Sequence, residues 1–237
     1  MKIELCLKKE VNFLIILYQK LKGQQNFENL QFSFPKKIEK NSCKKEIKKM
    51  LRESKFSFEE IKENPFLKEF YLKNIPIFEA YWQENLKKLE LIKRNLESKI
   101  SSFDLDLFNK VGNFFSKNPP EKIKIWICMG NETVFGSGNA FSPNLAVVFP
   151  RKFRGFDEKS LKNDFAVLIH EIVHLCQNMC SEGTNKEFLE KATSCFAPRG
   201  ILINEEKRKI KDKFYLKLRD FFTKGKTISE LIEYTKT

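Results

Sequence analysis

The chain has 237 residues, and 41% of them are hydrophobic, which is enough for the core of one large domain or two small ones. Glycine is scarce, with 9 copies against 24 of phenylalanine, so the composition favours helices over a glycine-rich β architecture. The net charge of +13 would attract acidic partners such as nucleic acid, anionic lipid or acidic polypeptide, although lysines scattered over a solvated surface give the same excess.

The cysteines and the apolar runs exclude two further classes of protein. A chain this long and this rich in apolar residues does not need a disulfide framework, so we expect core thiols. The longest early apolar run, at 11–18, is far short of the roughly 20 residues that span a membrane, and Glu4 and Glu10 do not suit a signal peptide. We therefore expect an intracellular, cytoplasmic protein. The six cysteines are Cys6, Cys43, Cys128, Cys176, Cys180 and Cys195.

The first half of the chain is predicted to be mostly helical. Apolar residues recur at helical spacing in four stretches, and Ser57-x-x-Glu60 has the form of a capping box that opens a short helix. Pro65 and Pro76 interrupt the pattern before the longest stretch. The four predicted helices cover 3–21, 37–54, 77–100 and 105–115.

Asn118-Pro119-Pro120 is the clearest break in the chain. The periodicity changes there, because residues 122–128 alternate between polar and apolar side chains as a strand does. We divide the chain at this point into a helical N-terminal region at 1–117 and a second region at 118–237.

The second region continues with mixed structure. Residues 133–141 are irregular, and the apolar run at 145–149 predicts a second strand. A helix is then expected to begin near Asp157 or Ser160 and to end before Gly183, which suits a helix C-cap. This helix contains the most informative stretch of the chain.

That stretch reads VLIHEIVHLC, in which His170-Glu171-x-x-His174 includes both of the chain's histidines. On a helix, the two imidazoles lie one turn apart and project the same way, so both can reach one metal ion. Zinc favours neutral imidazole nitrogen and lowers the pKa of a bound water to about 7. Glu171 lies beside the histidines, where it can accept the proton of that water and pass it to a leaving amine.

The two sides of this helix differ in character. The two histidines and Glu171 fall within an arc of roughly 100°, and the opposite side is apolar. The alternative without a metal is an amphipathic helix that happens to carry two surface or core histidines. The chain has no other histidine, so the occurrence of both at this spacing favours the metal site. Cys176 and Cys180 point away from the histidines, so core thiols are preferred to a second metal site. The apolar side consists of Phe165, Leu168, Ile169, Ile172, Val173, Cys176 and Met179.

The stretch VLIHEIVHLC resembles the active-site helix of the zincin metallopeptidases. The resemblance implies an α+β fold, here mostly helical, in which the N-terminal region precedes a zincin-like catalytic region at 118–237. A small antiparallel sheet would pack on the motif helix. An edge strand would bind the substrate backbone by β-addition, and 145–149 is the candidate. An ordinary core strand is the competing interpretation, because that run is entirely apolar.

A catalytic zinc needs three protein ligands and an open position. Since the chain has no third histidine, we expect a carboxylate, which makes the chain resemble the gluzincins, whose third ligand is a Glu on the next helix. Glu190 is preferred, because similar enzymes place this ligand in a run such as FLEKAT, after apolar residues and before small ones. Glu187, in the capping-box pattern Thr184-x-x-Glu187, and Glu182 remain open.

Two further roles follow from the same resemblance. The acidic residue that often orients a histidine in these enzymes is replaced by Ser194, so Thr193 or Ser194 would supply a weaker hydrogen bond. Related enzymes use a downstream His or Tyr to hold the oxyanion, which leaves Tyr215 and Tyr234 here. Tyr215, in a helix predicted at 205–222, is the candidate catalytic residue, against the alternative of a core aromatic.

The leading hypothesis is a zinc-dependent peptidase in which His170, His174 and Glu190 hold Zn²⁺ and Glu171 is the general base. Its partner would be a peptide or protein substrate. The alternative is a basic protein that binds nucleic acid or an acidic protein, with a structural or vestigial metal site. The intact Glu171 argues against this alternative, because a structural site requires no base. A peptidase drawn to nucleic acid by its charge would combine the two.

Overall fold

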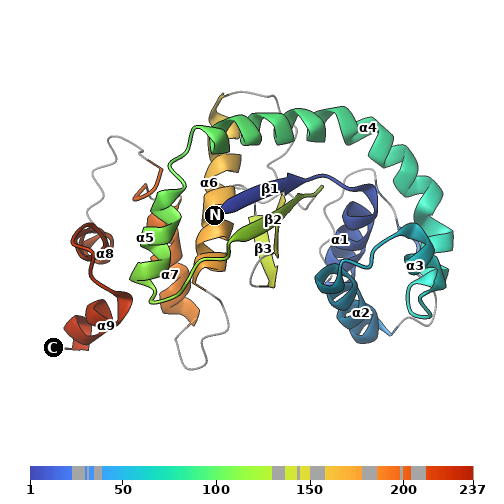
Figure 1. Ribbon diagram of the computed structural model, residues 1–237. Helices are drawn as coiled ribbons and strands as arrows, with labels where there is room; N and C mark the ends of the chain where they lie inside the picture. The colour runs from blue at the N-terminus through green and yellow to red at the C-terminus, as the bar shows by residue number, and fades with distance from the viewer. Residues whose placement is uncertain are drawn as a thin grey trace.

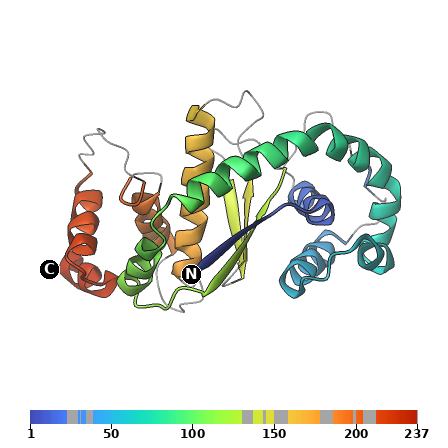
Figure 2. The same cartoon turned by 45° about the horizontal axis from the view of Figure 1, so that its top comes forward.

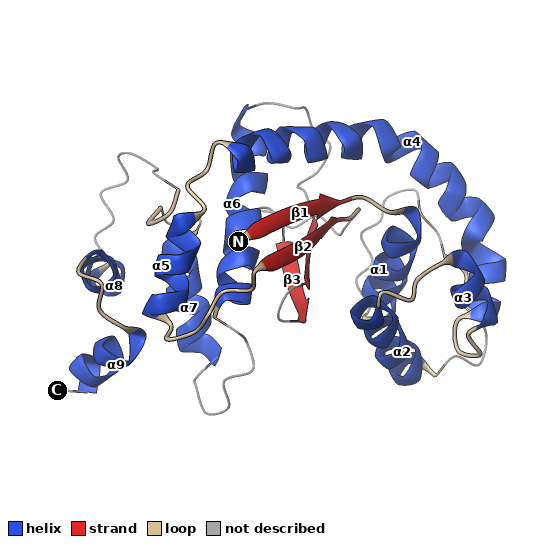
Figure 3. Ribbon diagram, in the orientation of Figure 1, coloured by secondary structure: helices blue, strands red, loops and turns tan. Residues whose placement is uncertain are grey.

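The computed structural model describes residues 1–22, 30, 32–34, 39–129, 137–142, 145–149, 158–177, 186–197, 200–203 and 212–236. Helices predominate in these ranges and flank a small sheet, which agrees with the predicted mostly helical α+β class (Figures 1 and 3). The strands are β1 (Lys2–Cys6), β2 (Lys122–Ile127), β3 (Ser137–Ser142) and β4 (Leu145–Phe149). The helices are α1 (Lys9–Leu21), α2 (Lys40–Glu53), α3 (Phe58–Glu63), α4 (Lys68–Ser101), α5 (Asp106–Phe114), α6 (Glu158–Cys176), α7 (Lys186–Phe196), α8 (Lys213–Thr223) and α9 (Ile228–Lys236).

The described strands form one mixed sheet in the order β1-β2-β4-β3. β1 and β4 both run parallel to β2, and only β3 is antiparallel to its neighbour β4. The prediction of an antiparallel sheet is therefore wrong. Parallel neighbours need a long crossover connection, and the helices α1 to α5 supply one between β1 and β2.

β1 corrects the prediction of a single helix over 3–21. Residues Lys2–Cys6 form a strand, and the helix begins only at Lys9. The strand pairs with β2 along its whole length, with Ile3 opposite Ile123 and Leu5 opposite Ile125. This non-local pairing, rather than local helix propensity, decides the conformation of the first residues.

β4 occupies the predicted residues 145–149, but it lies inside the sheet, between β2 and β3. Both of its hydrogen-bonding edges are paired, so it cannot add a substrate strand, and that prediction is wrong. The all-apolar sequence of β4 fits a strand buried on both faces. The edge on this side of the described sheet is β3, which overlaps the stretch 133–141, expected to be irregular, and extends one residue beyond it.

α6 lies between the sheet and the C-terminal helices (Figures 1 and 2). It contacts β3 and β4 on one side and α5 and α7 on the other, and α4 crosses near its N-terminal end. The side chains predicted for its apolar face are buried wherever they are described, and Met179 lies outside the described residues. The sheet therefore fixes the position of the helix that carries the histidines.

The N-terminal helices have a phenylalanine-rich core. The ring of Phe13, on the fully buried middle of α1, lies 5.1 Å from that of Phe78 and 5.9 Å from that of Phe70. Asn12 joins this core to the sheet, because its Oδ1 accepts the backbone N–H of Met129 at 2.7 Å and its Nδ2 donates to the carbonyl of Ile127 at 3.3 Å. Heavy use of phenylalanine thus reflects packing.

α4 is longer than the predicted helix at 77–100, because it begins at Lys68 and passes through Pro76. The proline removes one backbone hydrogen bond, and Figure 1 shows that the helix is curved. Buried Phe70 and Phe78 lie on either side of Pro76 in sequence, so packing against the core holds the helix together. The capping box at Ser57 is confirmed, since its Oγ accepts the Glu60 N–H and the Glu60 carboxylate accepts the Ser57 N–H.

None of the helices in the described ranges combines the length and hydropathy needed to cross a membrane. The division at residue 117 stays a prediction, and β1 from the first region pairs with β2 from the second. The zincin-like character of the second region and the cytoplasmic location also stay predictions.

Candidate metal centre

α6 presents both histidines on one side. Leu168, Ile169 and Val173 are buried against the core, while the side chains of His170 and His174 keep 17% and 10% of their surface exposed. Because residues four apart on a helix lie one above the other, the two imidazoles come together. Their Nε2 atoms are 3.0 Å apart.

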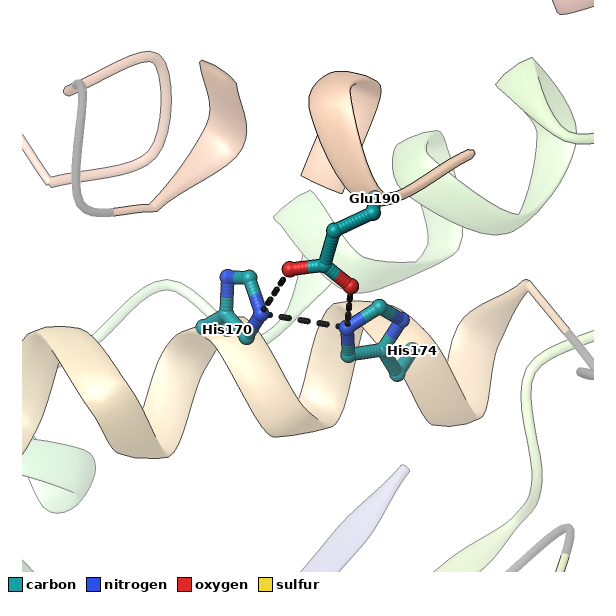
Figure 4. A group of neighbouring side chains, drawn as sticks. All are labelled: His170, His174 and Glu190. Carbon is teal, nitrogen blue, oxygen red and sulfur yellow. Dashed lines mark hydrogen bonds and ion pairs between the residues drawn. The ribbon is translucent and has the colours of Figure 1, made fainter. Parts of the chain in front are cut away.

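Glu190 of α7 completes the group (Figure 4). Its Oε1 lies 3.2 Å from Nε2 of His170, and its Oε2 lies 3.1 Å from Nε2 of His174. Of the candidate glutamates that the structure describes, Glu190 is the one that reaches the histidines. Glu187 is exposed at the start of α7 and is not part of the group, and Glu182 and Thr184 lie outside the described residues.

The other ring nitrogens set the tautomers of the two histidines. Nδ1 of His170 lies 2.9 Å from the carbonyl oxygen of Ala197, and a carbonyl can only accept, so this nitrogen donates. Nδ1 of His174 lies 3.1 Å from Oε1 of Gln177 and donates in the same way. In the neutral rings, both Nε2 atoms therefore carry lone pairs, which point at each other and at the Glu190 carboxylate.

Such a convergence of lone pairs needs a positive charge between them. Contacts with the two imidazoles hold the pKa of Glu190 far below its usual range, so the carboxylate is charged at neutral pH. Burial lowers the pKa of His170, but its contacts with Glu190 and the Ala197 carbonyl raise it by more. A proton can thus occupy the space that a metal ion would fill.

The spacing of the ligand atoms fits zinc. Ligand atoms at about 2.0–2.1 Å from a tetrahedral zinc ion are separated from one another by about 3.3 Å. The two Nε2 atoms are 3.0 Å apart, and each lies 3.2 or 3.1 Å from a different oxygen of Glu190, a few tenths of an ångström shorter. With one ligand atom taken from each residue, the three atoms lie within 4.8 Å of one another. Two imidazole nitrogens and a carboxylate are also a donor set that zinc accepts, and they leave a position open.

Glu171 is the remaining polar residue of the motif. It is buried, with 5% of its surface exposed, and among the described residues none donates a hydrogen bond to its carboxylate. Burial raises the pKa of Glu171, while charge on His170 and His174 opposes that shift. A carboxyl group that is poorly solvated and has no fixed partner in the described part of the chain is suited to exchanging a proton with a reactant.

Tyr215 is not placed at the centre by any described contact. It is buried on α8, which packs on α7, and its ring lies 5.8 Å from the guanidinium carbon of Arg219. None of the hydrogen bonds between described residues joins it to His170, His174 or Glu190. Its role at the oxyanion stays a prediction. Tyr234 is exposed on α9, with its ring 3.1 Å from Nζ of Lys217.

Sequence reasoning missed Gln177 and Ala197. The spacing of Gln177, three residues after His174, places the two on the same side of the helix and could have been noticed. The backbone carbonyl of Ala197 leaves no signal in the residue type. Thr193, predicted to contact a histidine, instead accepts a hydrogen bond from the amide of Gln177, which then contacts His174.

The cysteines described near the centre are core thiols, as expected from the sequence. Cys176 is fully buried on the far side of α6, and burial raises its pKa to about 12. Cys180, the other half of the weaker second-site interpretation, lies outside the described residues.

Comparisons of the chain with models of known protein families, with curated proteins and with solved structures find no match. Function must therefore be inferred from the chemistry of the site.

Proposed function

We propose that the protein is a zinc-dependent peptidase. His170 and His174 of α6 and Glu190 of α7 would hold the ion, and Glu171 would be the general base. The observation that carries this proposal is the meeting of His170, His174 and Glu190, whose ligand atoms lie within 4.8 Å of one another, beside a buried carboxyl group in the same motif.

Zinc, when bound, polarises the carbonyl of a scissile amide and lowers the pKa of a water molecule. The protein's own residues would perform the proton transfers. Glu171 takes a proton from the attacking water and delivers it to the leaving amine, which otherwise departs poorly as an anion. Burial raises the pKa of Glu171 toward neutral pH, so that the carboxyl group can both take up a proton and give it back.

Substrate would approach from the side of Glu190, whose side chain is 57% exposed. With β4 paired on both edges, β3 replaces it as the candidate strand for pairing with a substrate backbone. β3 contacts α6, so a peptide aligned along it would run close to the motif helix.

The base assignment is tested by Glu171→Gln. The amide keeps the size of the side chain but cannot take up a proton, so we expect hydrolysis of a fluorescent casein substrate to fall by about 10²–10⁴-fold. Zinc content, measured by atomic emission, should stay that of the wild type. Glu187→Gln is the matched control, because Glu187 is an exposed carboxylate outside the cluster, and both properties should survive.

Undiminished hydrolysis by the Glu171→Gln protein would refute the base assignment. Removal of metal with a chelator should abolish the activity, and added zinc should restore it. Full activity after complete metal removal would refute zinc catalysis altogether.

The alternative of a basic binding protein is favoured by the net charge of +13 and by the exposed cations of α2, among them Lys45, Lys48 and Arg52. Such a protein would bind nucleic acid tightly, in a salt-dependent way, and metal-loaded samples would show no hydrolysis. The position of Glu171 argues for the peptidase, and so does the presence of only three ligand residues among those that the structure describes, because structural zinc sites are closed by four protein ligands.

A further inference from the structure

Gln177 lies just beyond the end of α6 and is almost fully buried, with 3% of its surface exposed. Its backbone N–H donates to the carbonyl of Val173 at 2.9 Å, so it continues the last helical turn. Its side-chain amide bridges to α7, where Nε2 donates to Thr193 Oγ1 and, at 3.4 Å, to the Leu189 carbonyl. At its other end, Oε1 faces Nδ1 of His174.

The direction of this bridge is determined by its far end. The Thr193 hydroxyl donates to the Leu189 carbonyl at 2.9 Å, so its hydrogen is already used and its oxygen can only accept from Gln177. The Leu189 carbonyl is also an acceptor. The end of the amide that faces α7 must therefore be the NH₂ group, and the end that faces His174 must be the oxygen.

The same helix also fixes the other histidine. Glu190, Thr193 and Ala197 follow one another at spacings of three and four residues, which places them on one face of α7. Glu190 provides the carboxylate, Thr193 orients the amide that contacts His174, and the Ala197 carbonyl accepts from His170 at 2.9 Å. One face of α7 thus contacts both imidazoles, directly or through Gln177.

We infer that Gln177, oriented by Thr193, is a positioning residue of the metal centre. It holds His174 in the tautomer whose Nε2 lone pair faces Glu190, and it ties that tautomer to the docking of α7. This inference rests on the proposed zinc centre. A wrong tautomer would direct an N–H at the metal position, so the loss of Gln177 should weaken metal binding without removing a ligand.

A purely structural role for the amide is the competing explanation, and the measurements must separate the two. Asn74 offers a matched control, because it is also a buried amide that bridges two segments, bonding the N–H and C=O of Ser33 at 2.7 and 2.9 Å. Asn74→Leu should therefore lower stability and leave the metal centre unchanged.

The test compares Gln177→Leu, Gln177→Glu and Asn74→Leu in the full chain. The readouts are the Kd for zinc by competition with a chromophoric chelator, the visible absorption of the cobalt-loaded protein, and the urea unfolding of the metal-free protein. We expect Gln177→Leu to raise the zinc Kd by about 10–100-fold and to change the cobalt spectrum. Gln177→Glu keeps an acceptor for His174 but loses the donor to Thr193 and Leu189, so it should bind zinc more tightly than Gln177→Leu.

A wild-type Kd and cobalt spectrum in Gln177→Leu would overturn the inference, as would equal weakening in Gln177→Glu. If Gln177→Leu fails to fold, Thr193→Val and Thr193→Ser decide. The valine loses the hydroxyl that orients the amide and should bind zinc more weakly, the serine should restore binding, and equal Kd values for the two would contradict the inference. Absence of zinc binding in the wild type would overturn the proposed function itself, which is a different result from zinc binding that is insensitive to Gln177.

Discussion

Glu190 is the residue on which the site depends most at the scale of single side chains. The Nε2 atoms of the two histidines are 3.0 Å apart with lone pairs directed toward each other, and a third, charged group makes the position between them attractive to a divalent ion. Its carboxylate bridges both imidazoles in Figure 4. We therefore expect substitution of Glu190 to weaken zinc binding more than substitution of any neighbouring acidic residue on α7.

Glu190→Gln is expected to bind zinc much more weakly than the wild type. Replacing a residue that only hydrogen-bonds to a metal ligand weakens metal affinity by roughly 10–100-fold. The loss of zinc affinity in Glu190→Gln should be larger, because the ligand and its charge are removed together. Isothermal titration with zinc measures it, with Glu187→Gln as the control that should bind normally. Equal zinc affinity in the two variants would show that another residue completes the centre.

Buried cysteines allow a prediction that does not involve the metal. Burial raises the pKa of Cys176 to about 12 and holds that of Cys128 well above its ordinary value, so neither thiol forms the reactive thiolate near pH 8. Iodoacetamide should label them only after denaturation, as mapped by peptide mass spectrometry. Rapid labelling of either thiol in the folded protein would mean that this part of the core is open.

At the scale of elements, local patterns predicted what local interactions determine. β2, β4 and α6 were predictable because alternation, an apolar run and a 3.6-residue period are each visible over a few residues. β1 and β3 were not, since their strand conformation depends on partners distant in sequence. α4 continues through Pro76 because core packing outweighs the loss of one hydrogen bond. The strength of that packing cannot be read from the residues next to the proline.

The site divides in the same way. His170, Glu171 and His174 follow from spacing on one helix, and the preference for Glu190 on the next rests on the resemblance of its run to that of the gluzincins. Gln177 and the Ala197 carbonyl act between helices, so the docking of α7 on α6 had to be known first. Residue type reveals ligands more readily than the groups that orient them.

α5 gives a prediction about packing between an element and its connection. A Cβ added at Gly112 would lie 2.6 Å from Cδ of Pro119 and 2.7 Å from the carbonyl oxygen of Lys117. Alanine gains about 1 kcal/mol in helix propensity, but this clash with ring and backbone costs about 1–3 kcal/mol. The difference is a net loss of up to about 2 kcal/mol in the free energy of unfolding of Gly112→Ala.

Urea denaturation measures that loss. Asn113→Ala is the control, because Asn113 is the exposed neighbour on the same helix and should be neutral or slightly stabilised. A stabilised Gly112→Ala protein would mean that the connection around Pro119 moves aside at little cost.

At the scale of the whole molecule, the sheet joins the two regions of the chain. β1 covers one edge of β2. Asn12, at the start of α1, bonds the backbone of Ile127 and Met129, at the C-terminal end of β2. Residues 118–237 alone would leave the edge of β2, with its buried Ile123 and Ile125, open to other chains. The helices of the first region are thus part of the support of the site.

We predict that a protein of residues 118–237 does not fold cooperatively and aggregates. Circular dichroism and size-exclusion chromatography measure this directly. Co-expression with residues 1–117 as a separate chain is the control and should restore a soluble complex, because it returns β1 to its place beside β2. A stable, zinc-binding protein from residues 118–237 alone would show that the sheet does not need its first strand.

The central claim is that one divalent ion is held between α6 and α7. The most direct measurement is the metal content of the purified full-length protein and of His174→Ala, by atomic emission after dialysis against metal-free buffer. We expect about one zinc ion per chain in the wild type and almost none in the variant. A wild-type protein that retains no zinc and takes up none when it is offered in excess would contradict this claim.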